Sequence, residues 1–486
     1  MDQPYSRIAD ALLDYQYWSP SDPQSSIYDD TAWTMGELGN VEVVRVTDTK
    51  VLDAAMERVS GEVRSPGGVN SSGSVFVINH NGDNALATLR YRLKDVAIEA
   101  AEEPFEAGGH KFNRGSFIIR KVSADELQRV TGNLGVQVYA VADAPAVKTH
   151  PVRAARVAVM HTWLSTQDEG WWRLGLDQLQ VPFTYISTQD AANEADLRKK
   201  YDVIIFAPVG RGAAAIINGL PMYGNPLPWK TTTLTPNLGK TDQTDDMRPG
   251  LGLTGLMNLQ KFVSSGGVLI TAMDTSEFAV TYNFTPGVSA GRPQRLRAIG
   301  DILRMKTVDA KSPLAYGYGD SLAMYAFQGP IFNVSNTVGG GGGGRRGGGA
   351  REQRTTGRGT PDDPDTPQGR PPAEAPEMPK AEIWEPLPLT EEQRRNNGSI
   401  IPPAQRPRVV LRYADSRDLF VSGLLDGGDE IAQHAAVIDA PLGNGHVVLF
   451  STNPFWRGQT KGSYFLVLNA ILNFDSLNAG RKLDEK

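Results

Sequence analysis

Short apolar runs alternate with amphipathic stretches between residues 152 and 334. The apolar runs are RVAVM at 156–160, PFTYIS at 182–187, DVIIFAPVG at 202–210 and GGVLITAM at 266–273. Helical spacing is found between them, in GWWRLGLDQLQ at 170–180, ADLRKK at 195–200 and LTGLMNLQKFVSS at 253–265. Apolar strands that alternate with helices indicate a parallel sheet covered on both faces. We therefore predict an α/β domain with a flavodoxin-like, doubly wound parallel sheet.

The last hundred residues continue the same pattern. They contain RPRVVLRYAD at 406–415, AAVIDAPLGNGHVVLF at 435–450 and the amphipathic GSYFLVLNAILNF at 462–474. These segments are too few to bury a core of their own. We expect them to complete the sheet that begins before residue 338, so that one domain comprises 151–338 and 383–478.

The insertion at 339–382 is rich in Gly, Arg and Pro. From 339 to 380 it contains no aromatic residue and no Val, Ile or Leu, so it cannot bury enough surface to offset the entropy of ordering. We predict that it is disordered. An RNA-binding Arg-Gly segment is the alternative, but such segments interleave aromatic residues for base stacking, and we predict no nucleic-acid partner.

Two further regions precede the large domain. Residues 38–150 read as a smaller α/β domain, with strands such as VEVVRVTD at 41–48 and helices such as DNALATLRYRL at 83–93. Residues 1–37 hold a helical segment, SRIADALLDYQYW at 6–18, and an aromatic turn, YDDTAWTMG at 28–36. The helix has an apolar face that needs a cover.

Composition narrows the chemistry. The chain has 486 residues, a net charge of −6 with interspersed signs, and no cysteine, which excludes disulfides, thiolate zinc sites and thiol catalysis. No stretch of eighteen apolar residues predicts a membrane span. The N-terminus shows no signal peptide.

The functional crevice of a parallel sheet lies beyond the carboxyl ends of its strands. The candidate residues at those ends are His161, Arg211, Asp274, Ser276 and Arg457. The segment GGVLITAMDTSEF at 266–278 resembles the strand-to-helix elbow that carries a nucleophile. A triad of Ser276, His161 and Asp274 can be drawn, but Ser276 lacks the flanking glycines that such an elbow needs, and helix capping is the simpler role. We predict no catalytic residue in this chain.

Metal and cofactor motifs are also missing. None of the six histidines has the HxxxH, HxH or HxxE spacing of a zinc pair. The GRG at 210–212 is too short for a phosphate loop, although its backbone amides could face an anion. We therefore predict no metal and no cofactor in this chain.

A series of motifs resembles one family. It consists of PYSRIADALLDYQYW and YDDTAWTMG, then GSFIIRK at 115–121, PLAYGY at 313–318, and GNGHVVLFSTNPFWRGQTKGSYFLVLNAI at 443–471. The series is similar to the region downstream of the catalytic domain in bacterial zinc carboxypeptidases of the carboxypeptidase A clan. That region ends in a domain similar to class I glutamine amidotransferases, which here lacks the cysteine.

The resemblance implies an accessory role beside a zinc peptidase domain encoded in the same reading frame. Residues 1–37 would then be a helical linker remnant, and Met1 would be internal to a longer frame. The family's zinc site, an HxxE pair with a distant His, matches no position here. A periplasmic or secreted location would follow if the full-length protein carries a signal peptide. Two alternatives stay open: a stand-alone hydrolase or amidotransferase-like enzyme, and a peptide- or glycan-binding module.

Overall fold

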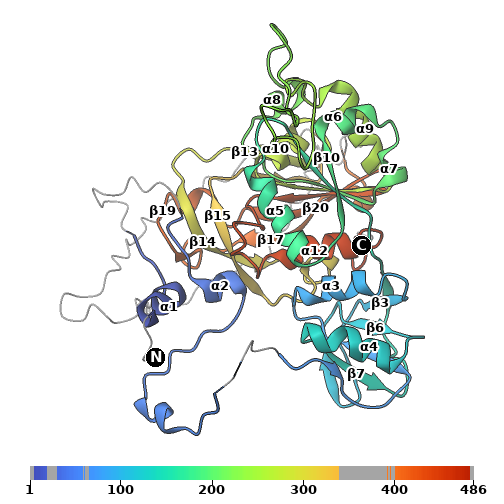
Figure 1. The fold of residues 1–486 in the computed structure, drawn as a ribbon, viewed down its shortest axis with the longest axis vertical. Helices are drawn as coiled ribbons and strands as arrows, with labels where there is room; N and C mark the ends of the chain where they lie inside the picture. The colour runs from blue at the N-terminus through green and yellow to red at the C-terminus, as the bar shows by residue number, and fades with distance from the viewer. Residues whose placement is uncertain are drawn as a thin grey trace, which may run out of the picture.

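The structure is a computed structural model that describes residues 5–18, 30–58, 60, 65–338, 391, 395 and 400–481. The predicted disordered insertion at 339–382 lies outside the described residues. The described strands form a 13-stranded sheet, a 6-stranded sheet and a 2-stranded hairpin. Figure 1 shows the large sheet with its helices above the smaller α/β unit.

Five parallel strands form one half of the large sheet. They are β9 (Val157–His161), β10 (Phe183–Ser187), β11 (Val203–Phe206), β12 (Val268–Ala272) and β21 (Gly445–Phe450). Their order across the sheet is β10-β9-β11-β12-β21, and each neighbouring pair is parallel. The predicted parallel α/β sheet is therefore present.

Helices cover both faces of the parallel half, as the apolar strands require. Alternate strand residues pack to opposite sides, Val157 and Val159 to one and Ala158 and Met160 to the other. The first side is covered by α5 (Gln167–Gln178) and α12 (Tyr464–Leu472). The second side is covered by α6 (Thr188–Asn193), α7 (Leu197–Lys200), α8 (Ala213–Asn218), α9 (Gly252–Ser264) and α10 (Asp274–Thr281).

The same sheet continues as an antiparallel half, which the sequence did not predict. Beyond β21 follow β20 (Ala435–Leu442), β17 (Arg408–Tyr413), β14 (Arg297–Thr307) and β15 (Ser321–Phe327). Four short strands flank it: β13 (Val288–Gly291), β16 (Ile331–Val334), β18 (Phe420–Ser422) and β19 (Leu425–Asp426). Three strands that follow the insertion in sequence, β17, β20 and β21, thus lie in the middle of the sheet.

The smaller sheet is mostly antiparallel. Its strands are β1 (Gly68–Val69), β2 (Val75–Ile78), β3 (Ile98–Ala101), β6 (Phe117–Ile119), β7 (Gln137–Val141) and β8 (Thr149–Val152), and of these described strands only β1 and β7 pair in parallel. Two helices, α3 (Ala85–Arg92) and α4 (Ala124–Thr131), accompany it, and β4 (Phe105–Ala107) and β5 (His110–Phe112) form the hairpin.

The strand predicted at 41–48 is wrong. These residues form no strand, and Val44 is 71% exposed. A valine-rich pattern indicates a strand only where another strand can pair with it and a core can cover it. Neither is present at this segment within the described part of the chain.

The N-terminal helix α1 (Ser6–Leu13) is likewise less covered than its apolar face suggested, since Ile8 is 55% exposed. Residues 30–38 dock firmly instead. The Thr31 and Ala32 amides donate to Gly300 O, both at 3.0 Å, and Leu38, in α2 (Met35–Gly39), belongs to the same buried hydrophobic cluster as Ile302.

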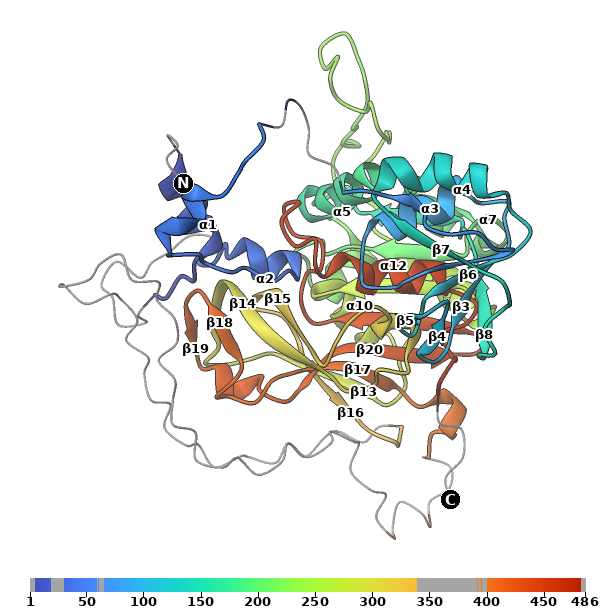
Figure 2. The same ribbon diagram turned by 90° about the horizontal axis from the view of Figure 1, so that it is seen from below.

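Helix α12 lies between the two sheets in both views (Figures 1 and 2), and all nine of its residues are buried. Asn469 Nδ2 donates to the carbonyls of Leu314 and Tyr316, and its Oδ1 lies 3.2 Å from His80 Nε2. Helix α12 therefore contacts both the small unit and the large domain. Among the described residues, no helix is long and apolar enough to cross a membrane.

Candidate functional site

The elbow between β12 and α10 is strained at Met273, not at Ser276. Met273 has φ 53° and ψ −118°, and its amide donates to Phe450 O at 2.8 Å. This conformation is costly for any residue with a Cβ, and it persists only where the surroundings impose it. The position at which an α/β enzyme presents its nucleophile is therefore held by a thioether.

Ser276 is a structural residue buried inside α10, and the capping role expected for it is wrong, because Met273 holds the N-cap position and no side chain caps this helix. Its hydroxyl lies 3.0 Å from Thr271 Oγ1 and donates to Phe450 O at 3.1 Å. It is thus committed to joining α10 to β12 and β21. The triad drawn from sequence is not formed, because His161 has a different carboxylate partner.

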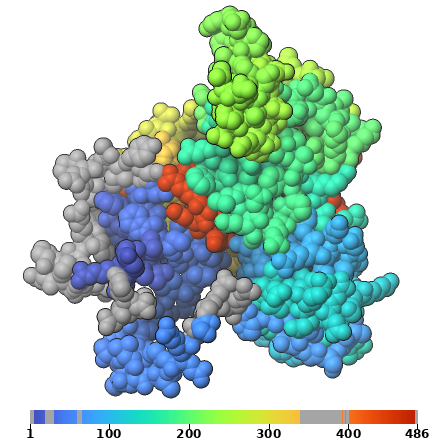
Figure 3. Space-filling model, viewed as in Figure 1, coloured from blue at the N-terminus to red at the C-terminus, as the bar shows by residue number. Residues whose placement is uncertain are grey.

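That partner is Asp242, in the long excursion 219–250 between α8 and α9. His161 is buried at the end of β9, and its Nε2 lies 2.9 Å from Asp242 Oδ2. Its ring stacks on Tyr185 with centroids 4.2 Å apart. We call residues 219–250 the arm, which projects from the top of the molecule in Figure 3. The His161–Asp242 pair holds the arm to the sheet.

A polar cluster that the sequence did not predict lies beside His161. The Tyr185 hydroxyl donates to Glu169 Oε1 at 2.5 Å, and the Arg173 guanidinium lies 4.3 Å from the centre of the Tyr185 ring. Burial raises the pKa of Glu169, and the hydrogen bond from Tyr185 opposes that shift. The i, i+4 spacing of Glu169 and Arg173 in a helix was the only signal available beforehand.

The side chain of Asp274 contacts the backbone of Arg211. The Asp274 carboxylate accepts hydrogen bonds from the Val209 amide at 3.2 Å and the Arg211 amide at 3.1 Å. Burial raises the pKa of Asp274 to about 6; the two amides oppose the shift and the nearby Asp168 adds to it. Burial also raises the pKa of Asp168, against the attraction of Arg457.

Arg457 faces this crevice but is engaged by the N-terminal segment. Its guanidinium lies 3.1 Å from the Asp30 carboxylate, which also accepts the Tyr325 hydroxyl at 2.6 Å and the Trp456 indole at 3.1 Å. Residue 30 belongs to the segment expected to be a linker. The positive charge of Arg457, which an anionic ligand could contact, is therefore already balanced by Asp30.

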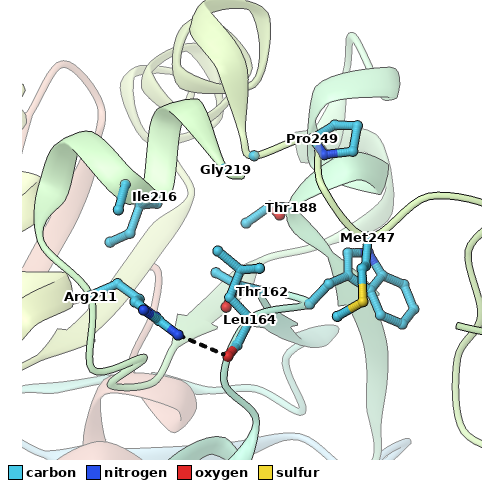
Figure 4. Close-up of a pocket in the computed structure, with 11 residues that line it drawn as sticks. Thr162, Leu164, Thr188, Arg211, Ile216, Gly219, Met247 and Pro249 are labelled. Atoms are coloured by element: carbon cyan, nitrogen blue, oxygen red, sulfur yellow. Dashed lines mark hydrogen bonds between the residues drawn. The ribbon is translucent and has the colours of Figure 1, made fainter. Parts of the chain in front are cut away.

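The space left at the strand ends is small. Figure 4 shows a pocket under the base of the arm, where Arg211 Nη2 lies 3.5 Å from Leu164 O. The cavity volume is ≈ 10 Å³, enough for about one water molecule. A wider groove of ≈ 440 Å³ runs beside β10 and is lined by Tyr185, Ile186, Asp190, Asn193, Glu194, Leu197, Lys200, Tyr201 and Asp242.

Within the described ranges, no three His, Asp or Glu side chains gather in a group that could hold a metal ion. Of the five predicted crevice residues, the structure joins Asp274 to the Arg211 backbone and leaves His161 and Arg457 paired elsewhere. Ser276 is withdrawn into the core. Among the described residues of the elbow, none is an activated nucleophile.

No family model matches the chain, and no curated protein matches it. Solved structures align at low similarity. A β-galactosidase from Bacillus circulans sp. alkalophilus is 12% identical, with a TM-score of 0.27 over 75% of this chain and 35% of its own. A protein described as part of a GMP synthase, from Thermoplasma acidophilum, is 8% identical, with a TM-score of 0.31 over 65% and 94% of the two chains.

A protein described as ThuA-like, from Bacteroides uniformis, is 9% identical, with a TM-score of 0.29 over 67% of this chain and 94% of its own. The chain spans about a third of the length of the β-galactosidase it matches. Likenesses at these TM-scores carry no argument about function.

Proposed function

We propose that this chain is a non-catalytic accessory region of a zinc-carboxypeptidase-like protein. Its large domain would be a flavodoxin-like fold, similar to class I glutamine amidotransferases, that has kept the architecture without the chemistry. One observation carries the proposal: Met273 stands at the strained elbow where a nucleophile is required.

The flavodoxin-like assignment is supported by the order of the parallel strands. In chain order, the strands β9, β10, β11, β12 and β21 are arranged 2-1-3-4-5 across the sheet. This is the order of the flavodoxin-like folds, in which the crevice lies at the switch point beside the first strand. The antiparallel half is an addition to that plan.

The side chain at the elbow supports the proposed absence of chemistry. A thioether has no proton to lose and forms no acyl intermediate in the way that an activated thiolate or alkoxide does. A neighbouring base would also be needed, and both ring nitrogens of the buried His161 already have partners: Nε2 lies 2.9 Å from Asp242 Oδ2, and Nδ1 lies 3.2 Å from the Thr162 carbonyl oxygen. The contacts of Met273 and His161 therefore support a site without a nucleophile–base pair at this elbow.

The resemblance to the carboxypeptidase region is supported by where its motifs lie. Asp30, in the first aromatic motif, pairs with Arg457 in the last one. In the 313–318 motif, the Tyr316 carbonyl accepts from Asn469, and the Tyr318 hydroxyl donates to the carbonyl of Gly462 at 2.8 Å. The motifs contact one another, as expected if they maintain a fold and not a catalytic site.

An electrophilic glutamine analogue with a chloroketone group tests the loss of chemistry. Intact-mass measurement should find no adduct on the native chain after prolonged incubation. The Met273→Cys variant, treated with iodoacetamide, is the matched positive control, because it places a thiol at the elbow. Stoichiometric labelling of the native chain by the analogue would contradict the proposal.

The accessory role is tested by the DNA upstream of the codon for Met1. An open frame that encodes an HxxE motif, and a signal peptide if the protein is periplasmic or secreted, is the expected result. An in-frame stop codon with a ribosome-binding site next to Met1 would refute it. This outcome is independent of the labelling experiment.

Peptide or glycan binding is the second candidate, and the groove beside β10 is the observation that favours it. Its wall carries two tyrosines, Tyr185 and Tyr201, together with Asp190, Glu194 and Lys200. Aromatic rings with a polar rim suit an extended polar ligand. Titration of the chain with peptide and glycan libraries should find binders that Tyr201→Ala weakens.

A further inference from the structure

Two backbone amides in the loop after β11 point at one carboxylate oxygen. Asp274 Oδ2 accepts from Val209 N at 3.2 Å and from Arg211 N at 3.1 Å, and Oδ1 also lies 3.3 Å from Val209 N. These are the contacts that a bound carboxylate would make, except that the carboxylate belongs to the chain itself.

The loop is shaped for this contact. Gly210 has φ 63°, so the peptide units on either side turn their N–H groups toward a common point. Successive N–H groups arranged in this way form a concave anion-binding nest. An added Cβ at Gly210 would meet no described atom within 4 Å, so packing within the described part of the chain does not explain the loop's geometry.

The charges around the loop have both signs. Arg211 extends its exposed side chain from the same loop, and Arg292 and Arg457 are close enough to interact with Asp274 and Asp168, respectively. Asp168 faces Asp274 from the start of α5. Arg292 is also paired with Glu277, and Arg457 with Asp30, so the contacts that favour an anion at this position are the backbone amides of Val209 and Arg211, which oppose the rise in the pKa of Asp274.

We propose that residues 209–211 form a binding site for a carboxylate or a small oxyanion, and that Asp274 occupies this site from within the chain. While Asp274 is in place, the two amides are unavailable to any other anion. An external anion binds only when the Asp274 side chain leaves. The inference goes beyond the proposed function, because it holds whether or not Met273 is chemically inert.

The test removes the internal carboxylate and supplies an external one. In Asp274→Ala the amides lose their acceptor and a space of about the size of a carboxylate group opens. The folding equilibrium of this variant is measured by urea unfolding in increasing sodium acetate, with sodium chloride at matched ionic strength as the reference. If the dissociation constant is on the order of 10 mM, about 100 mM acetate shifts the equilibrium about elevenfold toward the folded state.

Asp274→Asn is the matched control, because its side-chain oxygen still accepts from the two amides. It and the native chain should show no acetate-specific shift. Sulfate in place of acetate distinguishes the two ligand classes: a response to acetate alone identifies a carboxylate site, and a response to both identifies a general oxyanion site. If Asp274→Ala and Asp274→Asn respond alike, or neither responds, the proposal is wrong.

Asp274→Ser provides a second route if the alanine variant is too unstable to purify, because its short side chain also leaves room for the anion. In either opened variant, the amide resonances of Val209 and Arg211 should move on addition of acetate and saturate with the same midpoint as the stability. Resonances that stay in place while stability changes would overturn the assignment to this loop.

Discussion

Asp301 makes the stability of this protein depend on pH in a direction that a single substitution can test. The side chain lies in the middle of β14, is fully buried, and accepts the Thr31 hydroxyl at 2.5 Å and the Leu424 amide at 2.6 Å through Oδ1. Its Oδ2 has no hydrogen-bond partner among the described residues. Burial raises the pKa of Asp301 from 3.8 to about 8, and the two hydrogen bonds reduce the shift.

The sign follows from proton counting. Between about pH 4 and pH 8 the folded protein keeps the proton on Asp301, whereas the unfolded chain has lost it. The folded state binds more protons in this window, so its stability falls as pH rises through it. The loss for one such group is at most about 1.4 kcal/mol per pH unit, which is on the order of 3 kcal/mol from pH 5 to pH 7.

Asp301→Asn removes this dependence and keeps an oxygen for Thr31 and Leu424. In urea unfolding at pH 5, 6, 7 and 8, the free energy of unfolding of the variant should increase relative to that of the native chain as pH rises. The exposed Asp320→Asn serves as the control and should change nothing. A constant difference between native and Asp301→Asn across the series would refute the reasoning.

Three further predictions concern packing and the arm. Leu468→Ala, in the fully buried α12, should lower the free energy of unfolding by about 3–5 kcal/mol in a urea melt, whereas Leu174→Ala, which is 38% exposed, should cost far less. Deletion of 340–379 should leave the melt unchanged or raise stability by on the order of 1 kcal/mol, since a shorter loop is easier to close. Asp242→Ala should speed tryptic cleavage of the arm several-fold, and Asp245→Ala, which removes only an exposed ion pair, should not.

The parallel half of the sheet was predictable because its signal is local. Strands such as 156–160 and 203–206 are apolar on both faces, and amphipathic helices separate them, so the period of hydrophobicity alone determines the layers. The antiparallel half could not be predicted in this way. Strand β14 pairs with β17 across about a hundred residues, and nothing in either segment identifies its partner.

The segment at 41–48 illustrates the opposite error. Its valines have a strong β propensity, but propensity describes how a side chain fits a half-buried surface, and that surface comes from the rest of the fold. Residues 30–38 had no such pattern and yet pack on β14 through Ala32 and Leu38. Tertiary contacts therefore determine why residues 41–48 form no strand and why residues 30–38 are packed.

At the candidate site, residue types were easier to predict than positions. The sequence indicated an elbow after 266–272. Which residue takes a positive φ depends on the path of the backbone between β12 and α10, and no residue type in the sequence identifies that position. The hydroxyl of Ser276 made it the candidate nucleophile, although helix capping was its predicted role, whereas the strain falls on Met273, whose thioether is not suited to attack. The strained backbone at Met273 lowers the stability of the fold, and a thioether at this position does not use that strain for catalysis. It is therefore more simply understood as a geometry imposed by the strand–helix connection, in which Thr275 and Ser276 anchor α10 to the ends of β11, β12 and β21.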